Sequence, residues 1–400
     1  MTLFGLKEAE VAQLVRSVTR EGVELDRDEI ETRFARAAWS GIAEPGDGTA
    51  GLLIGALGAA GALAALVEKR PADELAPGIV PTDDAQQAID RWMPRLAPAM
   101  VLQWLRQAVR YGVRLAIPSD ELWPSGFADL REHAPLALWT RGRDEALGAL
   151  GRSIALVGAR AATGYGEHVT MEASAGLVDR GFAIVSGAAY GIDGMAHRAA
   201  LASRGHTIAF LAGGVDRFYP SGHDALLTRI VEHGLVASEL PCGSAPTRWR
   251  FLQRNRLIAA ASLATVVVEA GWRSGALNTA NHAGDAGRPV GAVPGPVRSA
   301  ASAGCHKLIR DGKAVLVATA DDMAELVGGI EPEEAHPYVR ENTRLLDALS
   351  TRVPRTPDDI AARSGLSVAQ AQSELARLEV EGAVRAGERG WTKRGAAREP

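Results

Sequence analysis

Residues 153–187 have the sequence SIALVGARAATGYGEHVTMEASAGLVDRGFAIVSG, and this stretch decides the fold of the chain. Two short apolar runs that end in glycine flank one segment of helix length, which is typical of a βαβ unit. The runs are apolar along their whole length, so both faces of each strand are expected to be buried. This pattern predicts a parallel sheet with helices on both faces.

The same alternation continues toward the C-terminus. Helix-length segments separate five further strand-length runs, which are HTIAFLAGG at 206–214, LVASEL at 235–240, ATVVVEA at 264–270, PVGAVPG at 289–295 and AVLVAT at 314–319. We therefore predict an α/β fold with a Rossmann-like doubly wound, mainly parallel sheet whose core spans residues 153–325.

The segments on either side of this core differ from it. The N-terminal sequence has the pattern of helices and no strand–helix alternation, whereas the C-terminal sequence indicates three helices and a short β-ribbon. We predict a helical N-terminal module at 1–80, of the SAM or helix-hairpin-helix type. A connecting region and the Rossmann-like domain follow at 81–328, and a winged helix at 340–400. Thr356 starts a helix of this last part with Pro357 in its first turn.

Composition limits the kind of protein. The chain has 400 residues, with 44 Lys and Arg against 48 Asp and Glu. A net charge of −4 excludes a protein that coats nucleic acid by overall positive charge, so a nucleic-acid site must be a local patch. Only Cys242 and Cys305 are present, too few for a disulfide framework, and we expect a cytoplasmic protein. Residues 51–67 are uncharged but short and rich in Gly and Ala, so we expect packed helices and no membrane span.

The ends of the predicted strands carry the candidate site, because ligands of doubly wound sheets bind outside the carboxyl ends of the strands. Glycines there let backbone amides approach phosphates, and arginines with aromatic residues are how single-stranded nucleic acid is held. Four arginines fall between 248 and 256. These features favour a polyanion as the ligand. The strand-end residues include Gly158, Arg160, Ser186, Gly187, Gly213, Gly214, Arg217, Phe218, Arg254, Asn255, Arg256, Ser274 and Gly275.

Other interpretations of the same residues stay open. The aromatic side chains could belong to the core, and the glycines could serve tight turns only. The chain has no P-loop and no GxGxxG motif after the first strand, so we expect no nucleotide cofactor. Asp193 and His197 could be acid–base groups, which leaves a nucleotide-binding or phosphoribohydrolase-like enzyme as the alternative. Such an enzyme needs a PGGxGTxxE-type loop, where this chain has VEAGWRSGALNTA.

A series of motifs resembles the bacterial DNA-processing protein family DprA, also called Smf. In order between residues 112 and 320, they are VGAR, TGYG, IVSGAAYGIDGMAHRAAL, TIAFLAGGVDRFYP, SEL, RNRLIAAAS, VVVEAGWRSGALNTA, AVPGP and GCHKLI. The resemblance implies single-stranded DNA binding by a homodimer. It also implies delivery of the strand to the RecA recombinase in natural transformation, and no catalytic activity or metal.

The resemblance also implies a DNA-binding pocket. Matched motif by motif, this pocket falls on Arg160, Ser186 and Gly187, Gly213 and Gly214 with Arg217 and Phe218, and Arg254 to Arg256, with Ser274, Gly275 and Lys307 as further contacts. The chain departs from the family where FLQ precedes RNR and where His306 replaces an Asn. In the winged helix, the expected recognition helix carries only Arg377 among three glutamates. This composition favours a protein contact or a weak duplex contact over base-specific binding.

Overall fold

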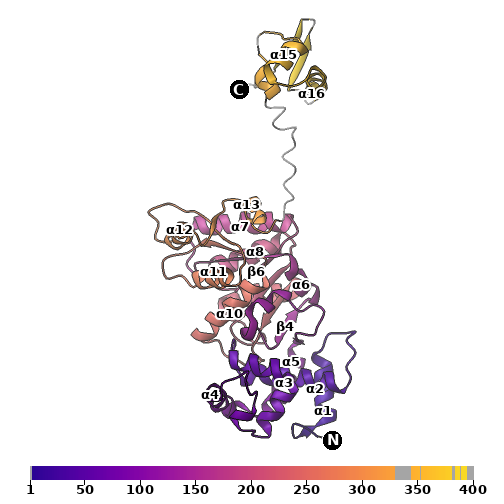
Figure 1. The fold of residues 1–400 in the computed structure, drawn as a ribbon, viewed down its shortest axis with the longest axis vertical. Helices are drawn as coiled ribbons and strands as arrows, with labels where there is room; N and C mark the ends of the chain where they lie inside the picture. Colours follow the sequence, from indigo (N-terminus) through magenta and orange to yellow (C-terminus); the bar gives the residue numbers. More distant parts are fainter. Residues whose placement is uncertain (1, 329–343, 352, 381–382, 388, 394–400) are drawn as a thin grey trace. The chain divides into compact units, whose positions relative to one another are not determined.

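The structure is a computed structural model that describes residues 2–328, 344–351, 353–380, 383–387 and 389–393. The chain divides into two compact units, Met1–Gly329 and Ile330–Pro400. The first unit contains a nine-stranded sheet and the helices around it, and the second is a small helical domain with one hairpin (Figure 1). Each unit has a hydrophobic core of its own.

The large sheet confirms the predicted α/β fold. Its strands, in spatial order, are β11 (Val315–Leu316), β10 (Val290–Ala292), β9 (Ala264–Glu269), β5 (Ser153–Gly158), β6 (Ala183–Ser186), β7 (Thr207–Phe210), β8 (Leu235–Ser238), β4 (Leu138–Gly142) and β3 (Arg114–Ala116). The strands from β11 to β8 pair in parallel, whereas β4 runs antiparallel to both β8 and β3. The parallel part is thus the predicted doubly wound core, extended by an antiparallel pair.

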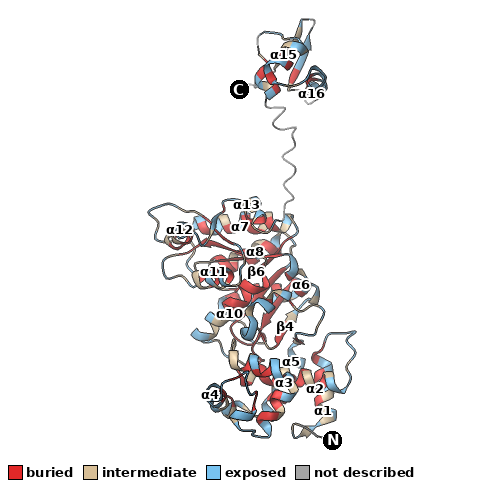
Figure 2. Ribbon diagram, viewed as in Figure 1, coloured by how far each residue is buried: buried red, intermediate tan, exposed pale blue. Residues whose placement is uncertain are grey.

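The order of the strands fixes where a ligand binds. From β5 the chain builds outward through β6, β7 and β8, then returns to place β9 on the other side of β5. The loops that leave β5 and β9 therefore diverge in opposite directions and leave a crevice at the carboxyl ends of these two strands. The strands themselves are buried on both faces, as Figure 2 shows by their red colour.

Helices cover both faces of the sheet. They are α6 (Asp144–Gly148), α7 (Gly164–Asp179), α8 (Ile192–Ala202), α9 (Asp224–His233), α10 (Arg248–Ala261), α11 (Ala276–Asp285), α12 (Ala303–Arg310) and α13 (Ala320–Glu325). One core cluster joins α10, α11 and α12 to one sheet face through residues such as Leu257 and Val267. The opposite face packs on α9, whose Leu227 and Ile230 are fully buried.

The N-terminal helices share that second core. A short hairpin, β1 (Thr2–Leu3) and β2 (Leu6–Lys7), precedes α1 (Glu8–Val18), α2 (Arg27–Ile42), α3 (Gly48–Val67), α4 (Thr82–Trp92) and α5 (Pro98–Tyr111). Helices α4 and α5, which follow residue 80, contact α3 and α1. The helical part thus continues to Tyr111. A hydrogen bond joins it to the sheet, because the Trp139 indole of β4 donates to Ser40 Oγ of α2 at 3.0 Å.

Helix α3 contains the uncharged segment noted in the sequence. Within the described part of the chain it is the one helix with the length and apolarity of a membrane span. Gly58 breaks it with a φ of +71°, and Leu53, Ala62 and Leu66 are buried. The Trp39 indole of α2 donates to the Ala59 carbonyl at 3.1 Å. The two halves of α3 therefore pack on the helical module along one side.

The second unit has the winged-helix elements that the sequence predicts. They are α15 (Pro357–Ser364), α16 (Val368–Val380), β12 (Val384–Gly387) and β13 (Gly390–Lys393), with a further helical turn at 344–348. Thr356 caps α15 by accepting from the Asp359 amide at 3.3 Å. On α16, Arg377 pairs with Glu374 at 3.1 Å, so the one cation of this helix is already neutralised. Residues 340–343 and 394–400 of the predicted domain lie outside the described residues.

Candidate nucleic-acid interface

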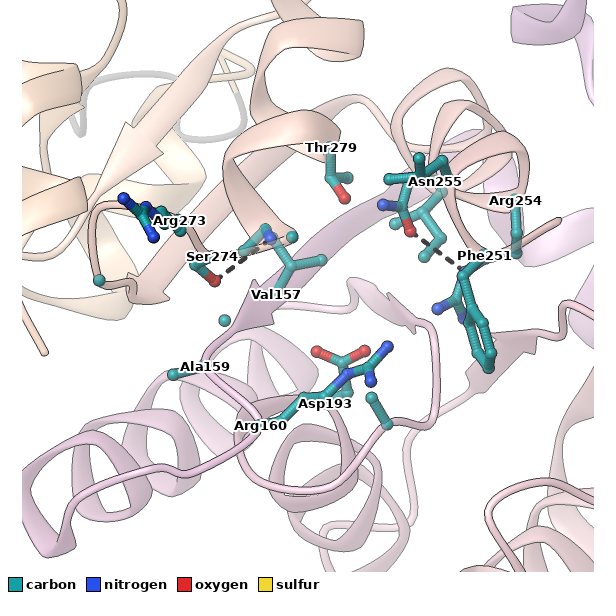
Figure 3. A pocket seen from close by; sticks show the side chains of 17 residues that line it. Val157, Ala159, Arg160, Asp193, Phe251, Arg254, Asn255, Arg273, Ser274 and Thr279 are labelled. Atoms are coloured by element: carbon teal, nitrogen blue, oxygen red, sulfur yellow. Dashed lines mark hydrogen bonds between the residues drawn. The ribbon is translucent and has the colours of Figure 1, made fainter. Parts of the chain in front are cut away.

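A cavity of about 510 Å³ lies at the carboxyl ends of β5 and β9, in the crevice that the strand order creates. Its walls come from the turn after β5, the start of α8, the first half of α10, and the loop that leads from β9 into α11. Figure 3 shows Arg160 and Asp193 across the cavity from Ser274 and Thr279, with Phe251 and Asn255 of α10 at one end. Four chain segments thus converge on one pocket.

Three guanidinium groups face this pocket. Arg160 and Arg273 are exposed, and neither makes an ion pair within the described residues. Arg254 is buried in the pocket wall. The guanidinium carbons of Arg160 and Arg254 lie 5.3 and 5.7 Å from the ring centroid of Phe251. The pocket therefore combines free positive charge with an aromatic ring, the two features that bind phosphate and base.

Arg254 is held by the sheet below it. Its Nη1 donates to the carbonyl oxygens of Gly187 and Phe210, both at 2.6 Å, and its Nε donates to Asn255 Oδ1 at 3.2 Å. Burial lowers the pKa of Arg254 to about 10, and the neighbouring Asp193 opposes that shift. The guanidinium remains charged at neutral pH and fixes the turn after β6 against the end of β7.

Asp193 is the acidic group of the pocket. It lies in the first turn of α8 and accepts from the Gly187 amide at 3.2 Å, while the backbone amides of Ala189 and Gly158 also stabilise its ionised form. Burial nevertheless raises the pKa of Asp193, and the Arg254 charge counteracts this. Asp193 thus occupies backbone donors beneath the pocket and neutralises part of the positive charge of Arg254.

The start of α11 lies at the pocket. Ser274 Oγ accepts from the Ala276 amide at 3.3 Å, and the amides of Leu277 and Asn278 donate to the carbonyl oxygens of Ser274 and Gly275. The first turn of α11 therefore favours an anion through its helix dipole and not through free amides. Glu269, which ends β9, accepts from the amide and hydroxyl of Thr163 at 2.8 and 2.7 Å. This carboxylate is therefore engaged in holding the loop after β5.

The structure brings six of the predicted residues to the pocket lining: Gly158, Arg160, Arg254, Asn255, Ser274 and Gly275. Two more lie directly beneath it. Ser186 is fully buried and donates to the Leu156 carbonyl at 2.6 Å. Gly187 leaves room for Arg254, since a Cβ there would lie 2.1 Å from Nη1.

The remaining predicted residues lie outside the lining. Arg256 is buried and pairs with Glu239. Burial raises the pKa of Glu239, and the charge of Arg256 opposes this shift. Gly213 and Gly214 are buried against the loop after β8. Lys307 is on α12 and pairs with Asp311. Arg217 is exposed, and Phe218 half-buried, in the loop after β7.

Eleven of the lining residues were not among the predicted contacts, and two of them, Arg273 and Asp193, are charged. Arg273 directly precedes the predicted Ser274, and this position indicates it as a further contact. The sequence indicates Asp193 only as a possible acid–base group. A carboxylate repels an anion, so nothing in the sequence indicates it as a contact of a polyanion. No cluster of metal-ligating side chains occurs among the described residues.

Comparisons with known proteins agree with this geometry. A family model described as DNA recombination-mediator protein A matches residues 114–328, and one described as the DprA winged helix domain matches 331–388. A curated relative from Mycobacterium tuberculosis, a putative DNA processing protein DprA, is 49% identical over 306 residues, covering 72% of this chain and 78% of the relative.

Two further matches extend this result. Protein Smf of Escherichia coli is 35% identical over 313 residues, covering 75% of this chain and 82% of its own length. The crystal structure of DNA processing protein A from Streptococcus pneumoniae superimposes with a TM-score of 0.59 at 27% identity, covering 76% of this chain and 98% of that one. The two family models together match both the large sheet and the C-terminal domain.

Proposed function

The chain belongs to the DNA recombination-mediator protein A (DprA, or Smf) family, and from this premise we propose that it binds single-stranded DNA in the pocket at the ends of β5 and β9. The observation that carries the proposal is the convergence there of Arg160, Arg254 and Arg273 with the Phe251 ring and the start of α11. Cations hold the phosphates, and the ring stacks on a base.

Single strands fit this site better than duplex does. A volume of about 510 Å³ is that of a small-molecule pocket and admits individual nucleotides. Phe251 is half-buried, so a base must leave its partner to stack on it. Glycines and amides contact any phosphate, and stacking tolerates any base, so we expect little sequence preference.

The test is fluorescence anisotropy with labelled oligo-dT and a duplex of equal length. We expect tighter binding of the single strand, and a logarithm of the affinity that falls with the logarithm of salt, with a slope of about −0.7 per neutralised phosphate. Arg160→Ala and Arg273→Ala should each weaken binding and reduce this slope. Arg91→Ala on α4 is the control, because Arg91 is 53% exposed and far from the lining residues in the sequence. Equal affinity for duplex, or variants that bind like the wild type, would contradict the proposal.

We propose further that the protein acts as a homodimer and delivers the bound strand to the RecA recombinase during natural transformation. Membership of the family supports this role. Sedimentation of the purified chain tests the dimer. The delivery is tested by whether the protein speeds RecA filament formation on a strand that is already covered by single-strand-binding protein. No acceleration over RecA alone would oppose it.

A nucleotide-processing enzyme is the second candidate, and Asp193 is the observation that favours it. This carboxyl lies in the pocket with a raised pKa, as a general acid would. A phosphoribohydrolase would release the base from nucleoside monophosphates. Incubation with such nucleotides followed by chromatography tests for that release. Base release that Asp193→Asn abolishes would favour the enzyme, whereas intact nucleotides favour the binding protein.

A further inference from the structure

A line of aromatic rings and guanidinium groups leads away from the pocket. The ring of Phe251, which lines the pocket, lies 5.5 Å from that of Tyr219. Phe218 precedes Tyr219 in the chain, and the Arg141 guanidinium carbon lies 5.5 Å from its ring centroid. The same guanidinium carbon lies 5.9 Å from the ring of Tyr111. The arginine–ring track consists of Phe251, Tyr219, Phe218, Arg141, Tyr111 and Arg110, whose guanidinium carbon is 5.7 Å from Tyr111.

The track reaches the surface at its two tyrosines. Tyr219 is 51% exposed and Tyr111 38% exposed, while Arg141 is half-buried and Phe218 is half-buried against the core. Its residues come from the end of α5, from β4, from the loop after β7 and from α10. Four segments that are distant in the sequence thus form two sets of contacts, Phe251 with Tyr219 and Arg141 with Phe218 and Tyr111, which the peptide bond between Phe218 and Tyr219 joins.

The charge of the track is positive. Arg110 and Arg141 form no ion pair with any residue that the structure describes, and Arg217 beside Phe218 is exposed and equally unpaired. The nearby carboxylate is Asp216, which already accepts from the Gly243 amide at 2.8 Å. Unpaired arginines with accessible rings form a platform for a flexible polyanion whose bases can stack.

We propose that a single strand bound in the pocket continues along the arginine–ring track, so that each chain holds more nucleotides than the pocket alone admits. This inference rests on the proposed function of the pocket. Bases stack on Tyr219 and Tyr111, and the phosphates between them lie near Arg141 and Arg110. The ligand of the track is single-stranded polynucleotide of any sequence, because its rings and charges contact no particular base edge.

The experiment compares two lengths of oligo-dT by anisotropy, one of about four nucleotides that extends little beyond the pocket and one of about twenty that reaches the track. The full chain is used as wild type and as Tyr111→Ala with Arg141→Ala. Arg152→Ala is the matched control, since Arg152 also lies over a ring, that of Phe182, at 4.8 Å and is exposed. We expect the double variant to bind the long oligonucleotide about tenfold more weakly and the short one like the wild type.

The outcomes separate the track from the pocket. Equal affinity of the double variant and the wild type for the long oligonucleotide would overturn the track and leave the pocket proposal standing. Equal loss for both lengths would also overturn it, because the changes would then act on the pocket or the fold. A wild-type chain that binds neither length would refute the proposed function itself. A second measurement uses the wild type alone. Its affinity for oligo-dT should increase further when the strand becomes long enough to extend from the pocket onto the track.

Discussion

At the scale of single residues, position along a helix decides which arginine can meet a ligand. Arg254 and Arg256 are neighbours in the RNR motif, yet two residues along a helix turn a side chain by about 200°. Arg254 therefore faces the pocket, and Arg256 faces Glu239 on the other side of α10. Helix α10 begins at Arg248, so the RNR motif starts in its second turn.

Asp193 and Arg254 are buried groups of opposite charge that interact electrostatically, so the loss of the carboxylate should destabilise the fold. Asp193→Ala leaves the Arg254 guanidinium buried without a counter-ion, and also frees the Gly187 amide. We expect the free energy of unfolding to fall by about 3–5 kcal/mol, as for other broken buried pairs. Urea unfolding followed by circular dichroism measures it. Asp224→Ala on the exposed start of α9 is the control, and an equally small loss in both variants would contradict this account.

His197 should make stability depend on pH. Thr207 Oγ1 donates to the Ile184 carbonyl, so it accepts from Nδ1 of His197, which is neutral and fully buried. Burial lowers the pKa of His197 to about 3, with His223 and Arg254 adding to the shift. The unfolded chain binds one proton more between pH 6.5 and 3, so stability present above pH 6.5 is lost on acidification, at up to about 1.4 kcal/mol per pH unit.

The measurement is urea unfolding between pH 7 and 5. His197→Gln should reduce the loss of stability on acidification, because the titrating group is removed. His206→Gln is the matched control, since His206 is an exposed histidine in the loop before β7. His206→Gln should keep the pH dependence of the wild type. If His197→Gln keeps it as well, the account of His197 is wrong.

At the scale of elements, the turn after β5 shapes the pocket. A Cβ on Gly158 would lie 2.5 Å from Cγ1 of Ile192 and 2.9 Å from the Glu269 carbonyl oxygen. Residue 158 must therefore lack a Cβ so that α8 and β9 can approach β5 closely. Because Gly158 lines the pocket, any displacement of α8 or β9 also changes the distance between Arg160 and Ser274.

Gly158→Ala should therefore lower both stability and affinity. We expect a loss of about 1–3 kcal/mol in the free energy of unfolding, as for other overpacked sites, with weaker binding of oligo-dT. Thermal melting and anisotropy measure the two effects. Gly151→Ala is the control, because its Cβ would have no atom within 4 Å. A Gly158→Ala chain as stable as the control would show that the turn has more room than the structure gives it.

Most of the strands and helices could be predicted from the sequence, but fewer of the side-chain contacts could. Strand-length apolar runs placed β5 to β10, because a strand buried on both faces is apolar throughout. The run of β11 is apolar too, although β11 is exposed at the edge of the sheet. The antiparallel pairing of β4 with β8 could not be predicted, because it joins segments about a hundred residues apart. The pairing of Arg256 with Glu239 was hidden because it depends on which side of α10 faces the end of β8. The topology thus predicted which strand ends meet. It did not predict which side chains remain unpaired, because that depends on tertiary contacts.

At the scale of the whole molecule, the binding site and the C-terminal domain belong to different units. The sheet, the pocket and both large core clusters lie within Met1–Gly329. The winged helix has its own core around Leu345, Ile360 and Leu375. Three of its seven described cations are paired, Arg355 and Arg363 with Asp359 and Arg377 with Glu374, while Arg385 and Arg389 are exposed near the hairpin.

A chain that ends at residue 328 should keep the pocket's affinity. All lining residues remain, and the first unit retains its cores, so binding of a short oligo-dT should stay within about twofold of the full chain. Anisotropy under identical salt measures it. The same fragment carrying Arg160→Ala serves as the control for binding at the pocket. A loss of tenfold or more in the unsubstituted fragment would assign the strand to the C-terminal domain instead.

The most direct test of the account is ultraviolet crosslinking of the full chain to a short oligo-dT, followed by mass spectrometry of the crosslinked peptides. Aromatic side chains that touch thymine are the ones that react, and Phe251 is the ring in the pocket. The account predicts crosslinks in the peptides that carry Phe251 and the loops after β5 and β9. Crosslinks found only in the helices before residue 111 or in the C-terminal domain would contradict it.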